Sequence, residues 1–490
     1  MAKSDKDPNE LVLSLISHTN VGKTALARTL LRKDVGEVAD SAHVTIVPEA
    51  YPLIEKGDLV AKLWDTPGFG SNLAKLAKRL RSSENPVGWI LHQVWDRRAD
   101  KSLWCSQEAI RNVQNESDIV LYLIDASLSP SETAYVDLEI EVIEWIGKPV
   151  LVFLNQVGQP DPEQDRLREA EWKAHLSRHE IVKHVDTLDA FTRSWTEEHL
   201  ILVKAAEILE GDAAKAARKL SEAWIDRNWN IFDDAAETLS GWALFALTDT
   251  EPLSQRGLSD RIRHLVSRKK RNKEFDRIQQ AMYERLAERT SEVVNQLIAL
   301  YGIDGETAAK IAESSSSEFD VKRDVEEPIA ATFGGAVSGL VGGLSADLIS
   351  GGMTFGGGAI VGMLLGGATT FALARGYNLT QTGQNMVRWT ENHFLAQIHF
   401  VLMLYLAISH YGRGRGAWQD PMHNPAHWET LLKRQIDDRK DEWASLWKKG
   451  GISADPQKME KKLKPLIRQT LSSVFAALYP RSADIFDRKR

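Results

Sequence analysis

One short segment, Leu11–Leu31, constrains the fold of this chain more than any other part of the sequence. Leu11–Ile16 is apolar enough to form a buried strand, and the residues from Ala25 onward have the spacing of a helix. The loop between them ends in Gly22-Lys23-Thr24. A strand, a loop that closes with Gly-Lys-Thr and a helix are together the context in which a phosphate-binding loop occurs. The segment therefore predicts a nucleotide site.

The residue types in this loop suit the binding of nucleotide phosphates. Gly22 lets the backbone come close to the phosphates, and amides at the start of the helix point toward an anion. Lys23 would place its charge on the β- and γ-phosphates as a catalytic group, and the Thr24 hydroxyl would bind Mg²⁺. Ser17 replaces the first glycine of the usual pattern, so we expect the loop to begin with ordinary backbone angles. The residues expected to contact the nucleotide here are Thr19, Asn20, Val21, Gly22, Lys23, Thr24 and Ala25.

A second motif points to the same site. The expected strand Asp58–Trp64 ends in Asp65-Thr66-Pro67-Gly68, which fits the pattern DxxG. Asp65 would hold Mg²⁺ through water, and the Gly68 amide would sense the γ-phosphate. Thr45, in the polar stretch between the motifs, would close over Mg²⁺ as a catalytic threonine. A solvated loop threonine is an equal alternative, and Ser41 is the only other hydroxyl there that could take the role.

The two motifs together carry a family resemblance. Asn20-Val21-Gly22-Lys23-Thr24 and Asp65-Thr66-Pro67-Gly68 resemble the Era/TrmE-like branch of translation-factor-class GTPases. With its long helical C-terminal part, the chain resembles bacterial GTPases that carry a large C-terminal domain of unknown function. The motif resemblance covers about residues 10–160. It implies GTP or GDP as the ligand, Mg²⁺ as the cofactor and hydrolysis of GTP to GDP and phosphate.

Two positions carry mechanistic implications of this resemblance. In Era/TrmE-like proteins the asparagine at the position of Asn20 can ligate a potassium ion that assists hydrolysis when two G domains pair. Asn20 could instead tie the loop to its own backbone. Phe69 stands where Ras-like proteins place a catalytic glutamine, and a phenylalanine ring cannot orient water. The resemblance therefore implies slow hydrolysis, completed by a cation, a G-domain homodimer or a partner.

The base-recognition motif departs from the family pattern. The expected strand Val150–Leu154 leads into Asn155 and Gln156, where NKxD would begin, and both are expected to contact the base. Asn155 can also brace the phosphate loop. Gly158 has no carboxylate to accept hydrogen bonds from guanine, although Asp161 follows and could substitute. The stretch Asp186–Ala190 is a weaker candidate for a fifth loop of the site.

The order of apolar and polar segments predicts the fold class. Short apolar runs alternate with helical patterns in the first 160 residues, which indicates βαβ units and a mainly parallel sheet. We therefore expect an α/β P-loop G domain followed by a large all-α C-terminal region. The expected parts are a G domain over 1–195, a charged helical domain over 196–327, a glycine-zipper hairpin over 328–376 and a C-terminal helical region over 377–490.

The glycine-rich stretch is the most unusual part of the C-terminal region. Residues 331–376 hold 14 of the 33 glycines, and residues 329–374 hold one charged side chain, Asp347. Glycines repeating every four residues let two helices approach closely, so we expect a hairpin with arms Ile329–Ile349 and Met353–Ala374. It could insert into a membrane, insert shallowly or conditionally, or be buried in protein. Phe394–Ser409, also apolar, is expected to be a core helix.

Composition restricts the function classes. With 61 Lys and Arg against 68 Asp and Glu, the net charge is −7, so nucleic acid is an unlikely partner. A single cysteine, Cys105, excludes a disulfide framework, and the first ten residues contain no apolar signal segment. We expect a cytoplasmic GTP-dependent switch at the inner membrane, contacting lipid or a membrane protein through residues 329–374. The alternatives are a soluble Era-like GTPase acting on RNA or ribosomes and a binding-only switch or scaffold.

Overall fold

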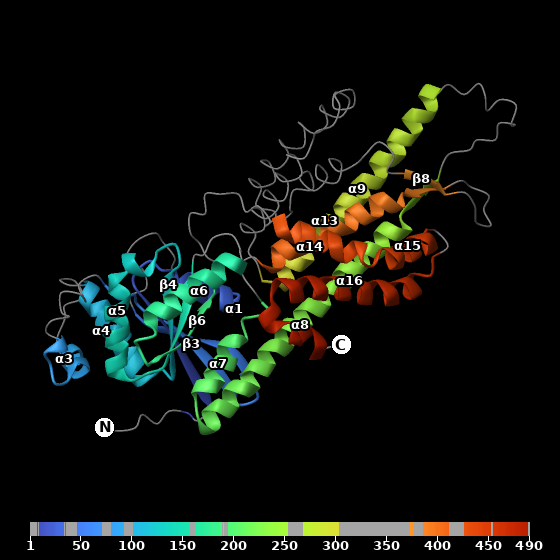
Figure 1. Cartoon of the computed structure of the whole chain (residues 1–490). Helices are drawn as coiled ribbons and strands as arrows, with labels where there is room; N and C mark the ends of the chain where they lie inside the picture. Colours follow the sequence, from blue (N-terminus) through green and yellow to red (C-terminus); the bar gives the residue numbers. More distant parts are fainter. Residues whose placement is uncertain are drawn as a thin grey trace, which may run out of the picture. The chain divides into compact units, whose positions relative to one another are not determined.

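The structure is a computed structural model of the whole chain, in which two compact units are distinguished (Figure 1). One unit comprises Met1–Trp229 with His410–Gln419, and the other comprises Asn230–Ser409 with Asp420–Arg490. The chain passes from the first unit to the second within helix α8 (Gly211–Thr248). The four parts predicted from the sequence stay a prediction. The residues that the structure describes are 7, 9–33, 35, 47–70, 80–92, 101–155, 162–188, 190, 195–252, 268–302, 373–376, 386–410, 426–451 and 454–488.

The first unit is built on a six-stranded sheet with the order β2-β3-β1-β4-β5-β6. All neighbouring strands are parallel except β2 and β3, which are antiparallel. The mainly parallel sheet confirms the α/β class predicted for this part of the chain. The strands are β1 (Glu10–Ser17), β2 (Glu49–Lys56), β3 (Leu59–Asp65), β4 (Ile119–Asp125), β5 (Val150–Asn155) and β6 (Val182–Thr187).

Helices cover both faces of this sheet, which is why its central strands are apolar without alternation. Residues Leu11, Leu13 and Leu15 of β1 pack on one side, together with α1, α7 and the first half of α8. Ile16 packs on the opposite side, where α3, α4, α5 and α6 lie. The helices are α1 (Lys23–Leu31), α3 (Pro86–His92), α4 (Lys101–Asn115), the short η1 (Pro130–Glu132), α5 (Ala134–Ile146), α6 (Pro162–Leu176) and α7 (Leu200–Ile208).

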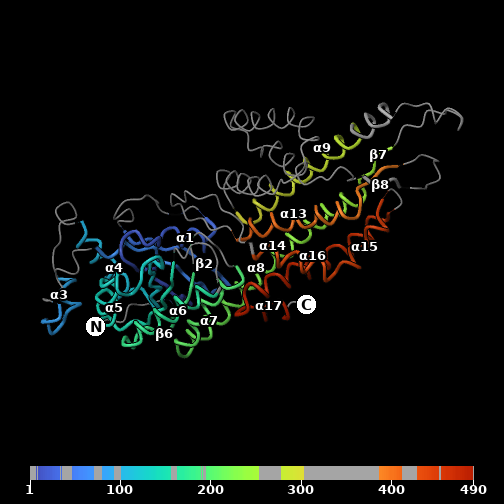
Figure 2. The backbone as a smooth tube through the Cα atoms, turned by 45° about the horizontal axis from the view of Figure 1, so that its top comes forward, coloured from blue at the N-terminus to red at the C-terminus, as the bar shows by residue number. Residues whose placement is uncertain are grey.

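The second unit is mainly helical, as expected, and also contains a small antiparallel sheet with the order β7-β9-β8 that the sequence analysis did not predict. Its helices α9 and α13 lie side by side in both views (Figures 1 and 2). Its elements after α8 are β7 (Thr250–Pro252), α9 (Arg268–Leu300), β8 (Leu373–Gly376), β9 (Met386–Trp389), α13 (Glu391–Ser409), α14 (Ala426–Asp437), α15 (Lys440–Lys449), α16 (Pro456–Leu478), η2 (Pro480–Ser482) and α17 (Asp484–Arg488).

The predicted glycine-zipper hairpin lies almost wholly outside the described residues. The prediction that its second arm is helical as far as Ala374 was wrong, because residues Leu373–Gly376 form strand β8 and pair with β9. The expected helix therefore does not extend to Ala374. The apolar run Phe394–Ser409 is part of α13, which is long and apolar enough to cross a membrane but has 78% of its most apolar window buried. Its burial agrees with the expected core helix.

Candidate nucleotide-binding site

The predicted phosphate-binding loop connects β1 to α1 at the carboxyl end of the sheet. Two of its residues have left-handed backbone angles, with φ of 65° at Asn20 and 93° at Gly22. Glycine adopts this conformation without steric cost, and asparagine tolerates it better than most residues. The loop therefore turns sharply into α1, so that Lys23 and Thr24 begin the helix and are both buried.

The side chains of Lys23 and Thr24 make hydrogen bonds within the predicted site. The Thr24 hydroxyl donates to Oδ2 of Asp65 over 2.6 Å, which brings two of the three predicted Mg²⁺ ligands together. The Lys23 ammonium donates to Oγ of Ser17 over 2.9 Å and to the backbone oxygen of His18 over 3.3 Å. Burial lowers the pKa of Lys23 from 10.5 to about 8, and the nearby charges of Asp65 and Glu139 oppose that shift.

The DxxG segment is attached directly to the phosphate loop. The amide of Phe69 donates to the oxygen of Ser17 over 2.9 Å, and the amide of Thr19 donates to the oxygen of Phe69 over 3.2 Å. Gly68 is so close that a Cβ atom there would lie 2.9 Å from the Thr19 Cα and 3.0 Å from the Lys23 Nζ. The Phe69 ring is fully buried in the core, so it cannot orient water at the loop surface.

Asn155 joins the loop from the end of β5. Its Nδ2 donates to the oxygen of Val21 over 2.6 Å, and its Oδ1 accepts from the amide of Ala190 over 2.8 Å. The first contact is the brace on the phosphate loop that the sequence predicted. The second places the end of the candidate fifth loop, Asp186–Ala190, against the same asparagine. Gln156, Gly158 and Asp161 lie outside the described residues.

The other predicted site residues are placed as follows. Asn20 is exposed on the loop, and its side chain makes no hydrogen bond to any residue that the structure describes. Val21 and Ala25 are buried and pack in the core on the α1 side of the sheet. Thr45 and its competitor Ser41 lie outside the described residues.

The arrangement of Thr24 and Asp65 fits a magnesium site completed by a nucleotide. Mg²⁺ in such sites takes one or two protein oxygens and fills its other positions with phosphate oxygens and water. Within the described ranges, no three His, Cys, Asp or Glu side chains gather into a complete metal site. The Thr24 hydroxyl and the Asp65 carboxylate, 2.6 Å apart beside the phosphate loop, are oxygen donors of the kind that such a magnesium site uses.

A third set of contacts was missed by the sequence analysis. Nδ1 of His18 donates to Oε1 of Glu139 over 2.6 Å, and the hydroxyl of Tyr122 donates to Oε2 of the same carboxylate over 2.7 Å. Glu139 is fully buried on α5, and burial raises its pKa. The available signal was its position in the helix, three residues after Val136 and four before Ile143, on the apolar stripe.

The fold and this loop geometry define a P-loop GTPase. The sequence of residues 13–156 matches the family of 50S ribosome-binding GTPases, and residues 173–472 match a domain of unknown function, DUF3482. Since that domain covers more than half of the chain, the protein belongs to the DUF3482 family and carries its G domain at the N-terminal side. No curated protein matches the sequence significantly.

Solved structures of GTPases are similar at low identity. A variant of Era from Aquifex aeolicus bound to GDP and aluminium fluoride has 14% identity and a TM-score of 0.31, over 60% of this chain and 90% of its own. NFeoB from S. thermophilus, bound to a GTP analogue, has 16% identity and a TM-score of 0.25, over 59% of this chain and 94% of its own.

Proposed function

We propose that this protein is a GTP-dependent switch that hydrolyses GTP slowly. The observation that supports this proposal is the parallel pairing of β1 and β3. It places the residues that follow β1, Lys23 and Thr24, beside Asp65 and Gly68 at the carboxyl end of the sheet. In this proposal Lys23 contacts the β- and γ-phosphates, and Thr24 and Asp65 hold Mg²⁺, which neutralises phosphate charge when bound. Asn155 braces the loop beside the base, and Thr45 closes over the metal.

Slow hydrolysis follows from the position of Phe69. Its ring is buried beneath the loop, so no side chain at this position orients the attacking water. We expect turnover on the order of 10⁻⁴ to 10⁻³ per second in the absence of a stimulating factor. The exposed Asn20 is available to bind K⁺ if two G domains pair, and in that case K⁺ accelerates hydrolysis while Na⁺ does not.

Nucleotide binding is tested with one substitution and a matched control. Lys23→Ala should abolish binding of GDP and of a GTP analogue with Mg²⁺ present, measured by calorimetry, while circular dichroism stays unchanged. Lys62→Ala is the control, because Lys62 is a partly exposed lysine of β3 that pairs with Glu10. Unchanged affinity in folded Lys23→Ala protein would reject the proposed site.

Hydrolysis and ion dependence need a separate measurement. Phosphate release from the full-length protein is compared in K⁺ and Na⁺, with Asn20→Ala beside the wild type. We expect K⁺ stimulation that disappears in Asn20→Ala. Binding without any phosphate release would favour a binding-only switch, and equal rates in both salts would reject the role of Asn20.

We further propose that the switch acts at the cytoplasmic face of the inner membrane. The support is the sequence of residues 329–374, with its one charged residue and its glycines at four-residue spacing. The full-length protein should co-sediment with liposomes, whereas a chain lacking residues 329–372 should not. This deletion leaves strand β8 in place. Equal co-sedimentation of both proteins, or of neither, would reject the membrane role of this segment.

A further inference from the structure

We propose that His18, held by Glu139, whose carboxylate is held in turn by Tyr122, is a positioning residue that keeps the phosphate loop in its nucleotide-binding conformation. This inference rests on the proposed nucleotide-binding function, and it assigns roles to His18, at a position that the phosphate-loop motif leaves open, and to two residues outside the motif, Tyr122 and Glu139. His18 is part of the loop itself, whereas Tyr122 is on β4 and Glu139 is on α5. The contact therefore joins the loop to two elements that are distant in sequence.

Two contacts fix the imidazole of His18, and a third fixes its backbone. Nδ1 of His18 donates to Glu139 over 2.6 Å, and the ring lies 4.3 Å from the Tyr135 ring, with 32° between the planes. The backbone of His18 pairs with Phe69 of the DxxG segment. The side chain and the backbone of one loop residue are thus bound to different parts of the fold. A residue held in this way has little freedom to rotate.

The buried carboxylate gives this contact its strength. Glu139 and Tyr122 are both buried, and the His18 side chain is 22% exposed, so the carboxylate that His18 contacts is shielded from water. Hydrogen bonds to a charged partner are roughly twice as strong as neutral ones. If His18 is removed, the carboxylate keeps Tyr122 but loses its closest partner, and the loop loses its attachment to α5.

Fixing the His18 side chain also fixes the group that Lys23 contacts. The oxygen of His18 accepts from the Lys23 ammonium over 3.3 Å and from the hydroxyl of Ser17. Ser17 in turn accepts from Lys23 over 2.9 Å. The two residues that open the loop therefore surround the lysine, and the position of His18 determines where that oxygen lies.

These contacts complete the attachment of the loop. On the α1 side of the sheet, Asn155 holds Val21 and Asp65 holds Thr24. On the opposite side, where α5 packs, the His18 side chain attaches the loop to α5, and the backbone of Ser17 and Thr19 attaches it to Phe69. Without it, only a fraction of molecules would have the binding-competent loop, and the apparent Kd rises as the reciprocal of that fraction.

The test compares substitutions of His18 in the full-length protein. His18→Ala should weaken binding of GDP and of a GTP analogue by the same factor, about tenfold, because a bond to a buried charge is lost. His18→Asn keeps an N–H donor near the Nδ1 position and should restore most of the affinity. Glu139→Gln leaves a neutral acceptor of the same shape and should give a smaller loss.

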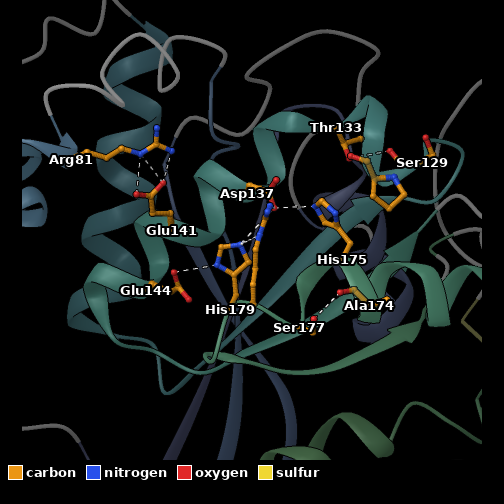
Figure 3. Close-up of polar contacts among 12 residues, drawn as sticks. Arg81, Ser129, Thr133, Asp137, Glu141, Glu144, Ala174, His175, Ser177 and His179 are labelled. Carbon is orange, nitrogen blue, oxygen red and sulfur yellow. Dashed lines mark hydrogen bonds and ion pairs between the residues drawn. The ribbon is translucent and has the colours of Figure 1, made fainter.

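The matched control is a histidine that pairs with the same helix but not with the loop. Nε2 of His175 on α6 donates to Asp137 on α5 over 3.0 Å (Figure 3). His175→Ala removes a histidine–carboxylate contact two residues from Glu139 in sequence, and should leave both nucleotide affinities unchanged. Thermal unfolding of each variant separates loss of the loop conformation from loss of the fold.

The outcomes distinguish this inference from the proposed function. If the wild type itself does not bind nucleotide, the proposed function fails and His18 has nothing to position. If the wild type binds and folded His18→Ala binds equally well, the positioning role is rejected while the site stands. A loss confined to the GTP analogue would also reject it, since it would show direct contact with the γ-phosphate. A lowered melting temperature with unchanged affinities would leave His18 a purely structural residue.

Discussion

Replacing Asn155 by alanine tests how strongly the phosphate loop depends on a side chain at the carboxyl end of strand β5. The side chain of Asn155 is fully buried and serves two partners. It donates to the oxygen of Val21 over 2.6 Å and accepts from the amide of Ala190 over 2.8 Å. Asn155→Ala removes both bonds at once and leaves two backbone groups without their partner.

The expected magnitude follows from those two groups. Leaving a buried donor or acceptor unsatisfied costs about 1–3 kcal/mol, and water entering the space would offset part of that cost. We therefore expect Asn155→Ala to lower the free energy of unfolding of the first unit by about 2–4 kcal/mol. Because the oxygen of Val21 belongs to the phosphate loop, nucleotide affinity should fall as well.

Urea unfolding followed by tryptophan fluorescence measures the stability, and calorimetry measures the nucleotide affinity. Ser14→Ala is the control, since the hydroxyl of Ser14 on β1 donates to Asn112 on α4 over 2.7 Å, away from the loop. It should cost about 1 kcal/mol and leave affinity unchanged. A loss below about 0.5 kcal/mol in Asn155→Ala would refute the reasoning, because surface substitutions commonly give that much.

Three further outcomes are expected. Gly68→Ala should weaken nucleotide binding in a calorimetric titration, because its Cβ would lie 2.9 Å from the Thr19 backbone; unchanged affinity would contradict the close approach. Burial lowers the pKa of His393 to about 4, so the unfolded chain binds a proton first as the pH falls below about 6.5. Stability of the second unit should therefore drop by about 3 kcal/mol between pH 6.5 and 4, and His393→Gln should flatten that dependence in urea titrations. Phe232→Ala should lower the stability of the same unit by about 3–5 kcal/mol in thermal unfolding, since the Phe232 ring is fully buried and its centroid lies 6.0 Å from that of the Phe475 ring. A loss under about 1 kcal/mol would contradict this.

The central strands were predictable because their signals are local. Leu11–Ile16, Ile119–Asp125 and Val150–Leu154 are continuous apolar runs, and burial on both faces produces such runs. The edge strand β2 was not predicted, because its exposed residues, including Pro52, carry little of that signal. The strands of the small second sheet are three or four residues long, too short for a periodicity to be detected.

The residues of the candidate site also fall into those that a local sequence signal identifies and those that it does not. Lys23, Thr24 and Asp65 are recognisable because each motif places its residue at a fixed offset from a strand. The partner of His18 is not recognisable, because Glu139 follows it by 121 residues and reaches it only through the packing of α5 on the sheet. A sequence motif identifies the residues that bind the phosphates. It does not identify the residues elsewhere in the fold that hold the loop in position.

The side-chain contacts of Ser17 and His18 explain why the start of this loop differs from the usual glycine. Ser17 stands where the usual pattern has a glycine, and His18 stands at a position that the pattern leaves open; here both side chains make hydrogen bonds. The Ser17 hydroxyl bonds to Lys23, and the His18 ring bonds to Glu139. A glycine at position 17 would remove one of the two loop oxygens that Lys23 bonds, and an alanine at position 18 would remove one of the two side chains that bond Glu139. Restoring the usual glycine at position 17 should therefore weaken the loop rather than improve it.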